Sequence, residues 1–432
     1  MSRTFAGFLI IFILAVAGGV AWFFLRDRPG ERDISAKPFP QLPEPQFAAA
    51  DWPWWRGAAR DNHRPDDQPP TTWDEKSNIV WKQPIAGRAH SSPLILGEHI
   101  YLTTAETNLQ RQLIVCLDRD TGKKVWDTVL HEGNFPNEGH HPDNTHASST
   151  PATDGTLIFA AFANGSSVFL DAVDLKGNRA WSRECGPFGK GFGYGSSPAL
   201  WGPYVYLCDD SPSGGWITAI HRQTGEIGWR RGRKTGIGSY GSPTIWEVND
   251  RVLVVVPGNG KVTAYDARDG VVVRETGGLG ETSANTATVG DGLLFASSGY
   301  PERNLLAIKP DGGIAWQKKK SNAFPYPPTM LFSDKTLYIV SDQGVITTLD
   351  AATGNQLWDD KLPGSYYASP LLAGGNIYAC NRDGRTTVFK ADREAYERIS
   401  VNKLDAEISA SPIASGNRLY IRTVTHLYCI GK

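Results

Sequence analysis

The ten residues LDAATGNQLW, at positions 349–358, decide the fold, because related versions of this segment recur along most of the chain. Each version has a turn glycine followed four residues later by a large side chain, usually tryptophan. The six pairs are Gly122/Trp126, Gly177/Trp181, Gly225/Trp229, Gly270/Arg274, Gly312/Trp316 and Gly354/Trp358. Self-similarity at a regular period is typical of proteins in which one small unit is repeated and each copy packs against the next.

A second landmark, a small residue followed by proline, opens a strand in each unit. Its eight copies are Ser92-Pro93, Thr150-Pro151, Ser197-Pro198, Ser242-Pro243, a degenerate copy at 285–288, Pro327-Pro328, Ser369-Pro370 and Ser411-Pro412. Between the landmarks lie pairs of strand-like runs separated by a glycine turn, such as 336–340 and 345–350, so each unit supplies four short antiparallel strands. Units of this size are typical of propeller blades. The sequence therefore predicts an all-β, eight-bladed β-propeller, with a linear β-solenoid as the alternative.

The two ends of the repeat region predict how the ring closes. The last unit, residues 408–432, stops before its outer strand, whereas residues 78–81 form a strand-like run that belongs to no unit. We expect residues 78–85 to complete the eighth blade of a propeller domain spanning 78–432, because closure removes the open edge of the sheet.

The recurring tryptophans have an architectural interpretation. An aromatic side chain near the outer strand fills the widening gap between neighbouring blades. The structural set is Trp81, Trp126, Trp181, Trp229, Trp316 and Trp358. Arg274 in blade four, and the segment 391–396 in blade seven, lack this tryptophan, so those two sectors are expected to pack less tightly.

The N-terminal region predicts attachment to a membrane. Residues 5–25 carry no charge and are long enough to cross a bilayer as a helix, so 1–28 is expected to be an anchor, with a cleaved signal peptide as the alternative. The proline-rich residues 29–50 predict an extended spacer. Residues 51–77 predict an aromatic arm packed on the outside of the propeller. Positive charges at Arg26, Arg28 and Arg32 favour a cytoplasmic C-terminal domain by the positive-inside rule.

The composition narrows the range of partners. The chain has 432 residues, a formal net charge of −1, 46 glycines and 28 prolines. Such a balance provides no basic surface for binding a nucleic-acid backbone. The glycine-rich stretch 186–195 is not a phosphate loop, because a strand rather than a helix follows it.

The repeated segments 117–126 and 349–358, with aspartate, then threonine-glycine, then tryptophan, resemble the pyrroloquinoline quinone (PQQ)-like β-propeller repeats. The resemblance covers roughly residues 50–432 and implies an eight-bladed propeller of the superfamily that contains quinoprotein alcohol dehydrogenases and BamB-like envelope proteins. It also implies a periplasmic propeller anchored in the inner membrane, in conflict with the positive-inside rule. Fold alone does not determine which of the two functions applies.

For the dehydrogenases, the resemblance implies PQQ above a tryptophan on the propeller axis, calcium held by Glu and Asn, an Asp base and often a disulfide between adjacent cysteines. This chain has five separated cysteines and no adjacent pair. Cys116 and Cys429 align with alanines in other repeats and are expected to be small core residues. The acidic loop residues Asp209, Asp210, Asp342 and Asp383 form no ligand pattern.

The long first interval contains four of the nine histidines, within residues 131–146. Imidazoles and carboxylates suit a transition metal, which makes His140, His141, Asp143 and His146 candidate ligands. Contact with a substrate or partner, or a purely structural loop, are the alternatives. His90, just before the first landmark, is a separate candidate for the axial funnel.

The sequence as a whole predicts a membrane-anchored scaffold of the bacterial cell envelope, with no catalytic residues and no resident cofactor. Its expected partner is a protein, peptide or saccharide bound on a loop face. The alternatives are a PQQ- and calcium-dependent quinoprotein dehydrogenase, and a hydrolase or lyase that uses the histidine-rich loop.

Overall fold

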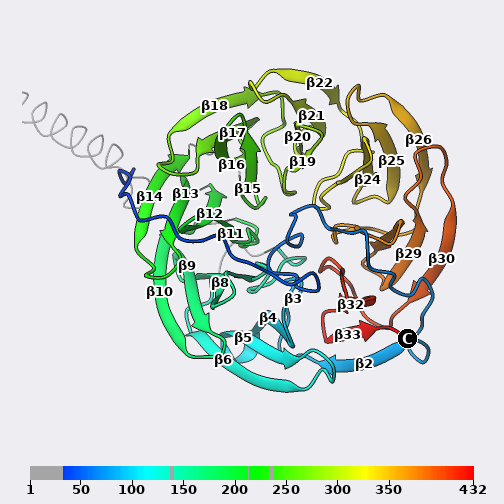
Figure 1. The fold of residues 1–432 in the computed structure, drawn as a ribbon, viewed down its shortest axis with the longest axis horizontal. Coiled ribbons are helices and arrows are strands. Elements are labelled where there is room, and N and C mark those ends of the chain that lie inside the picture. Colours follow the sequence, from blue (N-terminus) through cyan, green and yellow to red (C-terminus); the bar gives the residue numbers. More distant parts are fainter. Residues whose placement is uncertain (1–32, 137–140, 190, 213, 234–237) are drawn as a thin grey trace, which may run out of the picture.

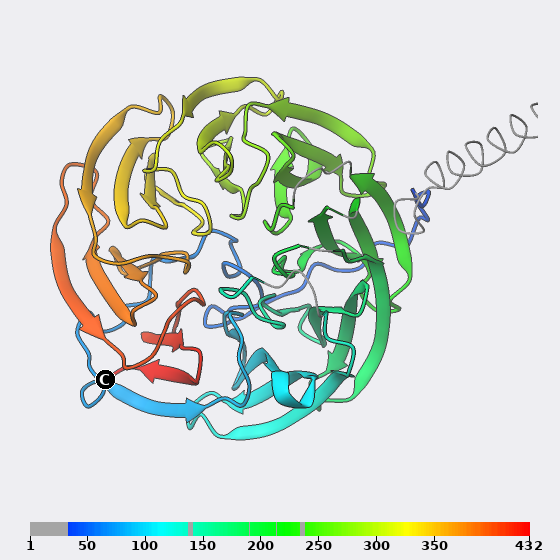
Figure 2. The same ribbon diagram turned by 180° about the vertical axis from the view of Figure 1, so that it is seen from behind.

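The computed structural model describes residues 33–136, 141–189, 191–212, 214–233 and 238–432. Eight sheets are arranged around a central axis like the blades of a propeller (Figure 1). The predicted all-β, eight-bladed architecture is confirmed. Within each blade the first strand lies nearest the axis and the last forms the outer rim, which is clear from both faces (Figures 1 and 2).

The strands follow the chain from blade to blade. Blades one to four comprise β3 (Leu94–Leu96), β4 (His99–Glu106), β5 (Arg111–Asp118) and β6 (Lys124–Glu132); β7 (Ala152–Thr153), β8 (Leu157–Asn164), β9 (Ser167–Asp174) and β10 (Arg179–Pro187); β11 (Ala199–Trp201), β12 (Tyr204–Ser211), β13 (Gly214–His221) and β14 (Ile227–Arg233); and β15 (Thr244–Val248), β16 (Arg251–Gly258), β17 (Lys261–Asp266) and β18 (Val272–Gly277). A short 3-10 helix, η1 (Thr107–Leu109), joins β4 to β5.

Blades five to seven repeat this order. They comprise β19 (Thr288–Gly290), β20 (Leu293–Ser297), β21 (Asn304–Ile308) and β22 (Ile314–Lys319); β23 (Leu331–Ser333), β24 (Thr336–Val340), β25 (Val345–Asp350) and β26 (Gln356–Lys361); and β27 (Leu371–Ala373), β28 (Asn376–Cys380), β29 (Arg385–Lys390) and β30 (Arg398–Lys403). The short strand β1 (His63–Arg64) adds to blade seven in parallel with β27.

Blade eight joins the two ends of the repeat region. Its strands are β31 (Ile413–Ser415), β32 (Arg418–Arg422), β33 (His426–Ile430) and β2 (Ile79–Pro84). The N-terminal strand β2 pairs antiparallel with β33 and supplies the outer strand that the last repeat lacks. Because β2 covers β33, the ring has no open edge at its seam.

Each outer-strand tryptophan lies opposite a small residue on the neighbouring strand. Trp126 pairs with Cys116, and Trp81 pairs with Cys429. The same register puts Ala219 opposite Trp229. Both cysteines are buried, which agrees with their interpretation as small core residues.

The turn glycine of one blade receives the tryptophan of the blade before it. Trp316 of blade five donates its indole N–H to the carbonyl of Ala351 in blade six over 2.8 Å. The ring packs so closely on Gly354, which has a φ of +71°, that a Cβ there would lie 2.7 Å from it. The repeat threonine closes the turn, because Thr353 donates its backbone N–H and its hydroxyl to Asp350 at 2.9 and 2.7 Å. The repeated Asp, Thr, Gly and Trp therefore form one inter-blade joint.

The two sectors without this tryptophan are filled differently. Arg274 packs its aliphatic part over Gly312, and its buried Nη1 has no hydrogen-bond partner among the described residues. In blade seven the corresponding position, opposite Val388, holds Ser400. Trp73 of the arm stacks on Tyr378 of that blade with ring centroids 6.3 Å apart. The arm therefore adds an aromatic side chain beside blade seven, whereas Arg274 holds the tryptophan position in blade four.

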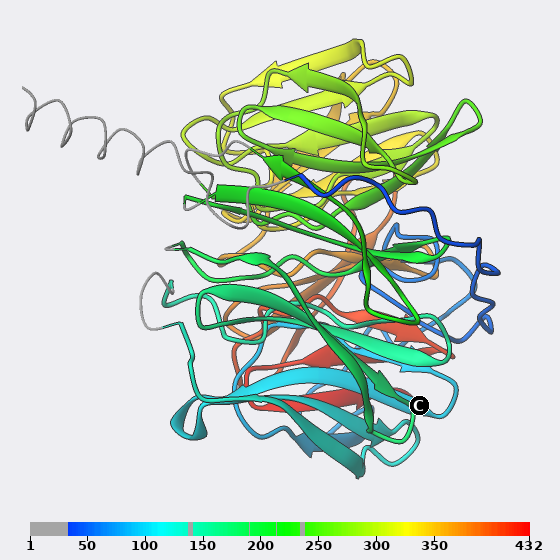
Figure 3. The ribbon, with the colours of Figure 1, turned by 90° about the vertical axis from the view of Figure 1, so that its left-hand side faces the viewer.

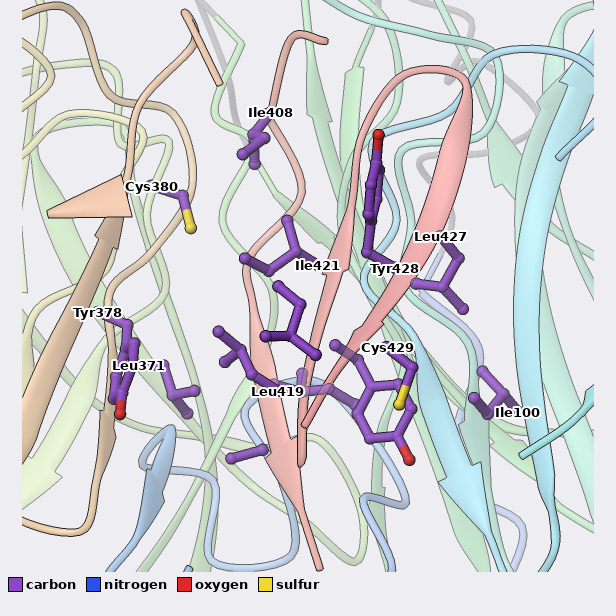
Figure 4. Packing of buried hydrophobic residues seen from close by; sticks show 14 of the residues in the cluster. Ile100, Leu371, Tyr378, Cys380, Ile408, Leu419, Ile421, Leu427, Tyr428 and Cys429 are labelled. Carbon is purple, nitrogen blue, oxygen red and sulfur yellow. The ribbon is translucent and has the colours of Figure 1, made fainter. Parts of the chain in front are cut away.

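The hydrophobic core is divided among the interfaces between blades. The largest cluster joins blades seven, eight and one and includes Tyr378, Leu419, Leu427 and Ile100 (Figure 4). Every one of these side chains is buried. The closing blade is therefore held by core packing on both sides as well as by its backbone ladder.

The segment before β2 runs along one face of the propeller (Figure 3). The spacer predicted over 29–50 is extended, but its described part contacts blade three: Lys37 N donates to Gly228 O at 2.8 Å, and Phe39 stacks on His221. Extended proline-rich backbone leaves carbonyls free to accept, and Arg222 donates to Pro43 O at 2.5 Å. The predicted span at 5–25 lies outside the described residues. No helix within the described ranges is long and apolar enough to cross a membrane.

Candidate functional site

The centre of the ring contains two stacked cavities. The outer one, which we call the vestibule, has a volume of about 360 Å³ and is lined by residues that include His90, Tyr240, Tyr326 and Tyr367. The inner one, which we call the chamber, has a volume of about 130 Å³ and reaches Trp55 at its far end. The two cavities share eight lining residues, so they form one axial space.

Those eight shared residues occupy the same position in every blade, and we call them the upper ring. They are His90, Ser148, Gly195, Tyr240, Ala284, Pro327, Tyr367 and Ser409. Each lies two residues before the start of the inner strand's landmark, where the chain turns towards the axis. The fold therefore places one side chain per blade around the axis, and its chemistry varies around the ring.

Two residues further along the chain, a lower ring of hydroxyls surrounds the chamber. Its members are Ser92, Thr150, Ser197, Ser242, Thr286, Thr329, Ser369 and Ser411. Thr329 shows that the sixth landmark lies at 329–330 rather than at the predicted Pro327-Pro328. Six of these hydroxyls accept a backbone N–H from the preceding blade, as Ser197 does from Thr150 at 3.0 Å and Ser369 does from Thr329 at 2.9 Å.

The aromatic arm closes the far end of the chamber. Trp55 donates its indole N–H to the Thr286 hydroxyl at 3.0 Å. The buried Arg56 donates to the Thr288 hydroxyl at 3.1 Å and to the Met330 carbonyl at 2.9 Å. Burial lowers the pKa of Arg56 to about 10. The arm expected on the outside of the propeller thus seals one mouth of its axis, because its polar groups find partners on the innermost strands.

His90 stands at the boundary between the two cavities, in the axial position considered for it. Its Nε2 atom is buried and has no hydrogen-bond partner among the described residues. Burial, with the positive charges of Arg88, Arg422 and Arg382, lowers the pKa of His90 to about 3. His90 is therefore neutral at physiological pH, in a region of positive potential.

Asp143 connects the histidine-rich loop of blade one to blade seven across the open mouth. Its carboxylate accepts from Arg382 at 2.6 Å and from the Tyr367 hydroxyl at 3.1 Å. Arg382 also pairs with Glu407 at 3.3 Å and lies over the Tyr367 ring. The Arg382 hydrogen bond lowers the pKa of Asp143 below its ordinary value. Asp143 is thereby held at the rim of the vestibule.

The predicted metal candidates are distributed over different surroundings. His141 lies at the vestibule, with its Nδ1 3.8 Å from Asp143 Oδ2. His146 packs against Phe135 with ring centroids 4.3 Å apart, and His140 lies outside the described residues. His131, from the same histidine-rich stretch, lies on strand β6 and bonds the buried Asp171 at 2.7 Å. Among the residues that the structure describes, no group of three or more His, Cys, Asp or Glu side chains is placed to hold a metal ion; the metal site stays a prediction.

The acidic residues considered as ligands have other surroundings. Asp210 forms a buried ion pair with Arg233 at 2.6 Å, and Asp342 pairs with Arg303 at 2.5 Å. Asp209 is buried beside Asp210, and desolvation raises its pKa to about 8. Asp383 is exposed near Arg385. All five cysteines are free thiols buried in the fold.

Sequence reasoning missed Phe192, Tyr240, Tyr326 and Tyr367, four aromatic side chains that line the vestibule. The upper-ring position holds eight residues of six different types, so it has no periodic composition. The upper-ring position can be found in the sequence only by its distance from the landmark, because Tyr240 and Tyr367 each stand two residues before a landmark serine.

One family model matches the sequence of nearly the whole propeller. The family model described as "Outer membrane protein assembly factor BamB" matches residues 71–209 and 213–431. The chain belongs to the BamB family. The BamB of Burkholderia pseudomallei (strain K96243) is 25% identical over 372 residues, which cover 80% of this chain and 85% of that protein. The BamB of Legionella pneumophila (strain Paris) is 25% identical over 114 residues, 26% of this chain and 28% of that protein.

The fold of this chain is similar to solved structures of both a BamB protein and a quinoprotein alcohol dehydrogenase. BamB from Moraxella catarrhalis superimposes with a TM-score of 0.61 and 15% identity, covering 82% of this chain and 99% of that chain. A quinohemoprotein alcohol dehydrogenase from Pseudomonas putida HK5 superimposes with a TM-score of 0.62 and 12% identity, covering 90% and 82%. At these identities the likeness to solved structures shows the fold alone. The predicted membership of the PQQ-repeat superfamily is confirmed by the family model and the relatives.

The donor set of the axial cavities does not fit the calcium ion that accompanies PQQ in the predicted alternative. Calcium takes six to eight oxygen ligands, with carboxylates prominent among them. Among the described lining residues of the two cavities Asp143 is the one carboxylate, and it is bound to Arg382 and Tyr367. The described lining therefore offers no ligand set for that calcium ion.

Proposed function

We propose that this BamB-family protein is a binding scaffold of the bacterial cell envelope that holds a protein or peptide partner at its vestibule and performs no chemistry there. The observation that carries the proposal is the difference between the two mouths of the axis. The arm seals one mouth, whereas the other presents aromatic side chains from three blades around a cavity of about 360 Å³.

The surface of the vestibule suits a macromolecular partner. Phe192 at its rim is 56% exposed and lies near Tyr240, with ring centroids 6.3 Å apart. Tyr326 and Tyr367 are half-buried, so each presents part of its ring. Exposed aromatic side chains surrounded by polar groups are typical of sites at which proteins bind their partners.

The proposal also includes a location in the envelope. The relatives named above are outer membrane protein assembly factors, which supports a protein partner and a periplasmic propeller for this chain. Anchoring in the inner membrane through residues 5–25 is part of the same proposal. We expect the full chain to resist carbonate extraction from membranes. Replacing residues 1–28 by a cleavable signal peptide should abolish that resistance.

Site-specific photo-crosslinking tests the binding site. A photoreactive phenylalanine analogue at Phe192 should give discrete adducts in cells. The same analogue at Ile314, which is 42% exposed on the outer strand β22, is the matched control. Adducts from Phe192 that are absent from Ile314 and weakened by Tyr326→Ala support the proposal. Identical adducts from both positions, or none from Phe192, contradict it; an adduct sensitive to glycosidase would indicate the saccharide that the sequence also allowed.

A further inference from the structure

The chamber presents a set of hydroxyl protons that have no acceptor. Seven lower-ring hydroxyls line it. Six of these, at Thr150, Ser197, Ser242, Thr329, Ser369 and Ser411, accept a backbone N–H. None of the six donates its own proton to a described residue. Since a hydroxyl carries one donor in addition to its acceptor sites, the blade-to-blade bonds leave these donors unused.

Two further polar atoms beside the chamber also lack partners. The hydroxyl of Ser92, the remaining lower-ring member, is buried without a hydrogen bond to any described residue. His90 Nε2, on the wall shared by chamber and vestibule, is in the same state. Unpartnered buried polar atoms also occur elsewhere among the described residues, but His90 borders a space in which a ligand or water can bond its Nε2 atom.

The charge around this space is positive. Arg422 is buried behind His90, and its Nη1 donates only to neutral oxygens, those of Ser91 and of Thr103 at 2.7 Å. Burial lowers the pKa of Arg422 to about 9, which leaves it charged at physiological pH. At the sealed end, Arg56 likewise donates to carbonyls and a hydroxyl rather than to a carboxylate. At the open end two carboxylates share Arg382: Asp143, and Glu407, which accepts from the upper-ring Ser409 at 3.0 Å.

We propose that the chamber binds a small oxyanion, a carboxylate or phosphate group, through the unused hydroxyl protons of the lower ring. Convergent hydroxyl donors in a confined space match the several acceptor oxygens of such a group. The guanidinium charges of Arg422 and Arg56 disfavour a cation, and a neutral ligand would leave Arg422 uncompensated, whereas Arg56 has the charge of Asp61 nearby. The inference goes beyond the scaffold function, since it concerns the chamber and holds whether or not a protein occupies the vestibule.

The same oxyanion has two sources, a free ion or the end of a larger ligand. Tyr240 and Tyr367 line both cavities, so an apolar body attached to the oxyanion would lie against their rings. Inorganic phosphate and phenyl phosphate distinguish the two sources, because they share the oxyanion and differ in that body.

Calorimetric titration of the full chain in detergent, at ionic strength matched with sodium chloride, tests the inference. Ala284→Phe is the blocking variant, because it fills the upper ring without removing a hydroxyl or a charge. Ala352→Phe, in an exposed turn, is the matched control. Saturable phosphate binding by the wild type and by Ala352→Phe, and at least tenfold weaker binding by Ala284→Phe, are expected.

A second variant tests the donors themselves. Ser197→Ala removes one hydroxyl proton, and because a hydrogen bond to a charged group contributes about 1.5–3 kcal/mol, binding should weaken about tenfold or more. Its far-ultraviolet circular dichroism must match that of the wild type. Tighter binding of phenyl phosphate than of inorganic phosphate identifies the end of a larger ligand, and equal binding identifies a free ion. If neither binds, or if Ala284→Phe binds as tightly as the wild type, the chamber holds water only and the inference is wrong.

Discussion

The two mouths of the propeller axis are built from the same eight repeats and differ in what occupies them. At the sealed mouth, Trp55 and Arg56 reach hydroxyls and carbonyls of the innermost strands, and Arg56 Nε alone of its nitrogens lacks a described partner. At the open mouth, His90 Nε2 has no described partner, and Tyr240 and Tyr367 line a cavity. A mouth filled by the chain's own side chains indicates architecture, whereas an unpartnered atom beside an open cavity indicates binding. The eight repeats alone would make the two mouths alike in construction, and the short arm that fills one of them leaves the other as the binding face.

The sealed mouth should show the largest loss of stability. Arg56→Ala removes a buried guanidinium and leaves the Met330 carbonyl and the Thr288 hydroxyl without that donor. We expect the free energy of unfolding to fall by about 3 kcal/mol. Arg251→Ala, at an exposed position on β16, is the control and should change it by less than about 0.5 kcal/mol. Urea unfolding measures both; equal effects would mean that the arm contributes nothing to closure.

A substitution at a joint between blades should also lower the free energy of unfolding, as one at the sealed mouth does. Gly354→Ala puts a Cβ at a φ of +71° and within 2.7 Å of the Trp316 ring. Gly97→Ala has a φ of +56° but open space around the new Cβ. We expect a loss of about 2 kcal/mol for Gly354→Ala and about 1 kcal/mol for Gly97→Ala, because the first adds a clash to the shared backbone cost. Thermal unfolding of the pair isolates the contribution of the tryptophan contact.

At the open mouth the expected effect is smaller and depends on pH. Asp143→Asn removes the partly exposed charge pair with Arg382 and should lower the free energy of unfolding by about 1 kcal/mol at pH 7. The folded-state pKa of Asp143 is lowered, so its contribution is present above the ordinary value of 3.8 and is lost as the pH falls through the lowered one. Urea unfolding of wild type and variant between pH 7 and pH 3 should show the difference shrinking. A constant difference would assign the effect to packing.

The smallest expected effect concerns the quinone. Adding PQQ with calcium to the full chain should leave the thermal midpoint unchanged and produce no bound-quinone absorbance, because Asp143 is committed to Arg382. Dye-linked alcohol oxidation should likewise stay at background. Stoichiometric quinone binding would revive the dehydrogenase alternative and would show that the rim rearranges to release Asp143.

The repeat architecture was predictable because its chemistry is local. Asp350, Thr353 and Gly354 build their turn within five residues, and Trp358 marks the rim in the same segment. Local patterns of this kind are visible in a single sequence.

The site was less predictable because its neighbours are distant in sequence. Arg56 meets Met330, and Asp143 meets Arg382, through ring geometry that no local pattern contains. The histidine-rich loop illustrates the same limit. His131 belongs to the interior beside Asp171, whereas His141 lies at the mouth. His90 was considered for the axis because it precedes a landmark, and the same reasoning applied to every landmark would have found Tyr240 and Tyr367.

The pairing of β2 with β33 also affects when the ring can close during synthesis of the chain. Residues 79–84 leave the ribosome before any blade exists, whereas their partners at 426–430 belong to the eighth blade. The arm waits less long, since Asn62 bonds the Pro370 carbonyl in blade seven. A nascent chain therefore holds an unpaired strand until residues 426–430 have been made, so the rim closes in a late step, after the partners of the arm are available. A chain cut short before residue 426 would carry an exposed strand that quality-control proteases and chaperones recognise.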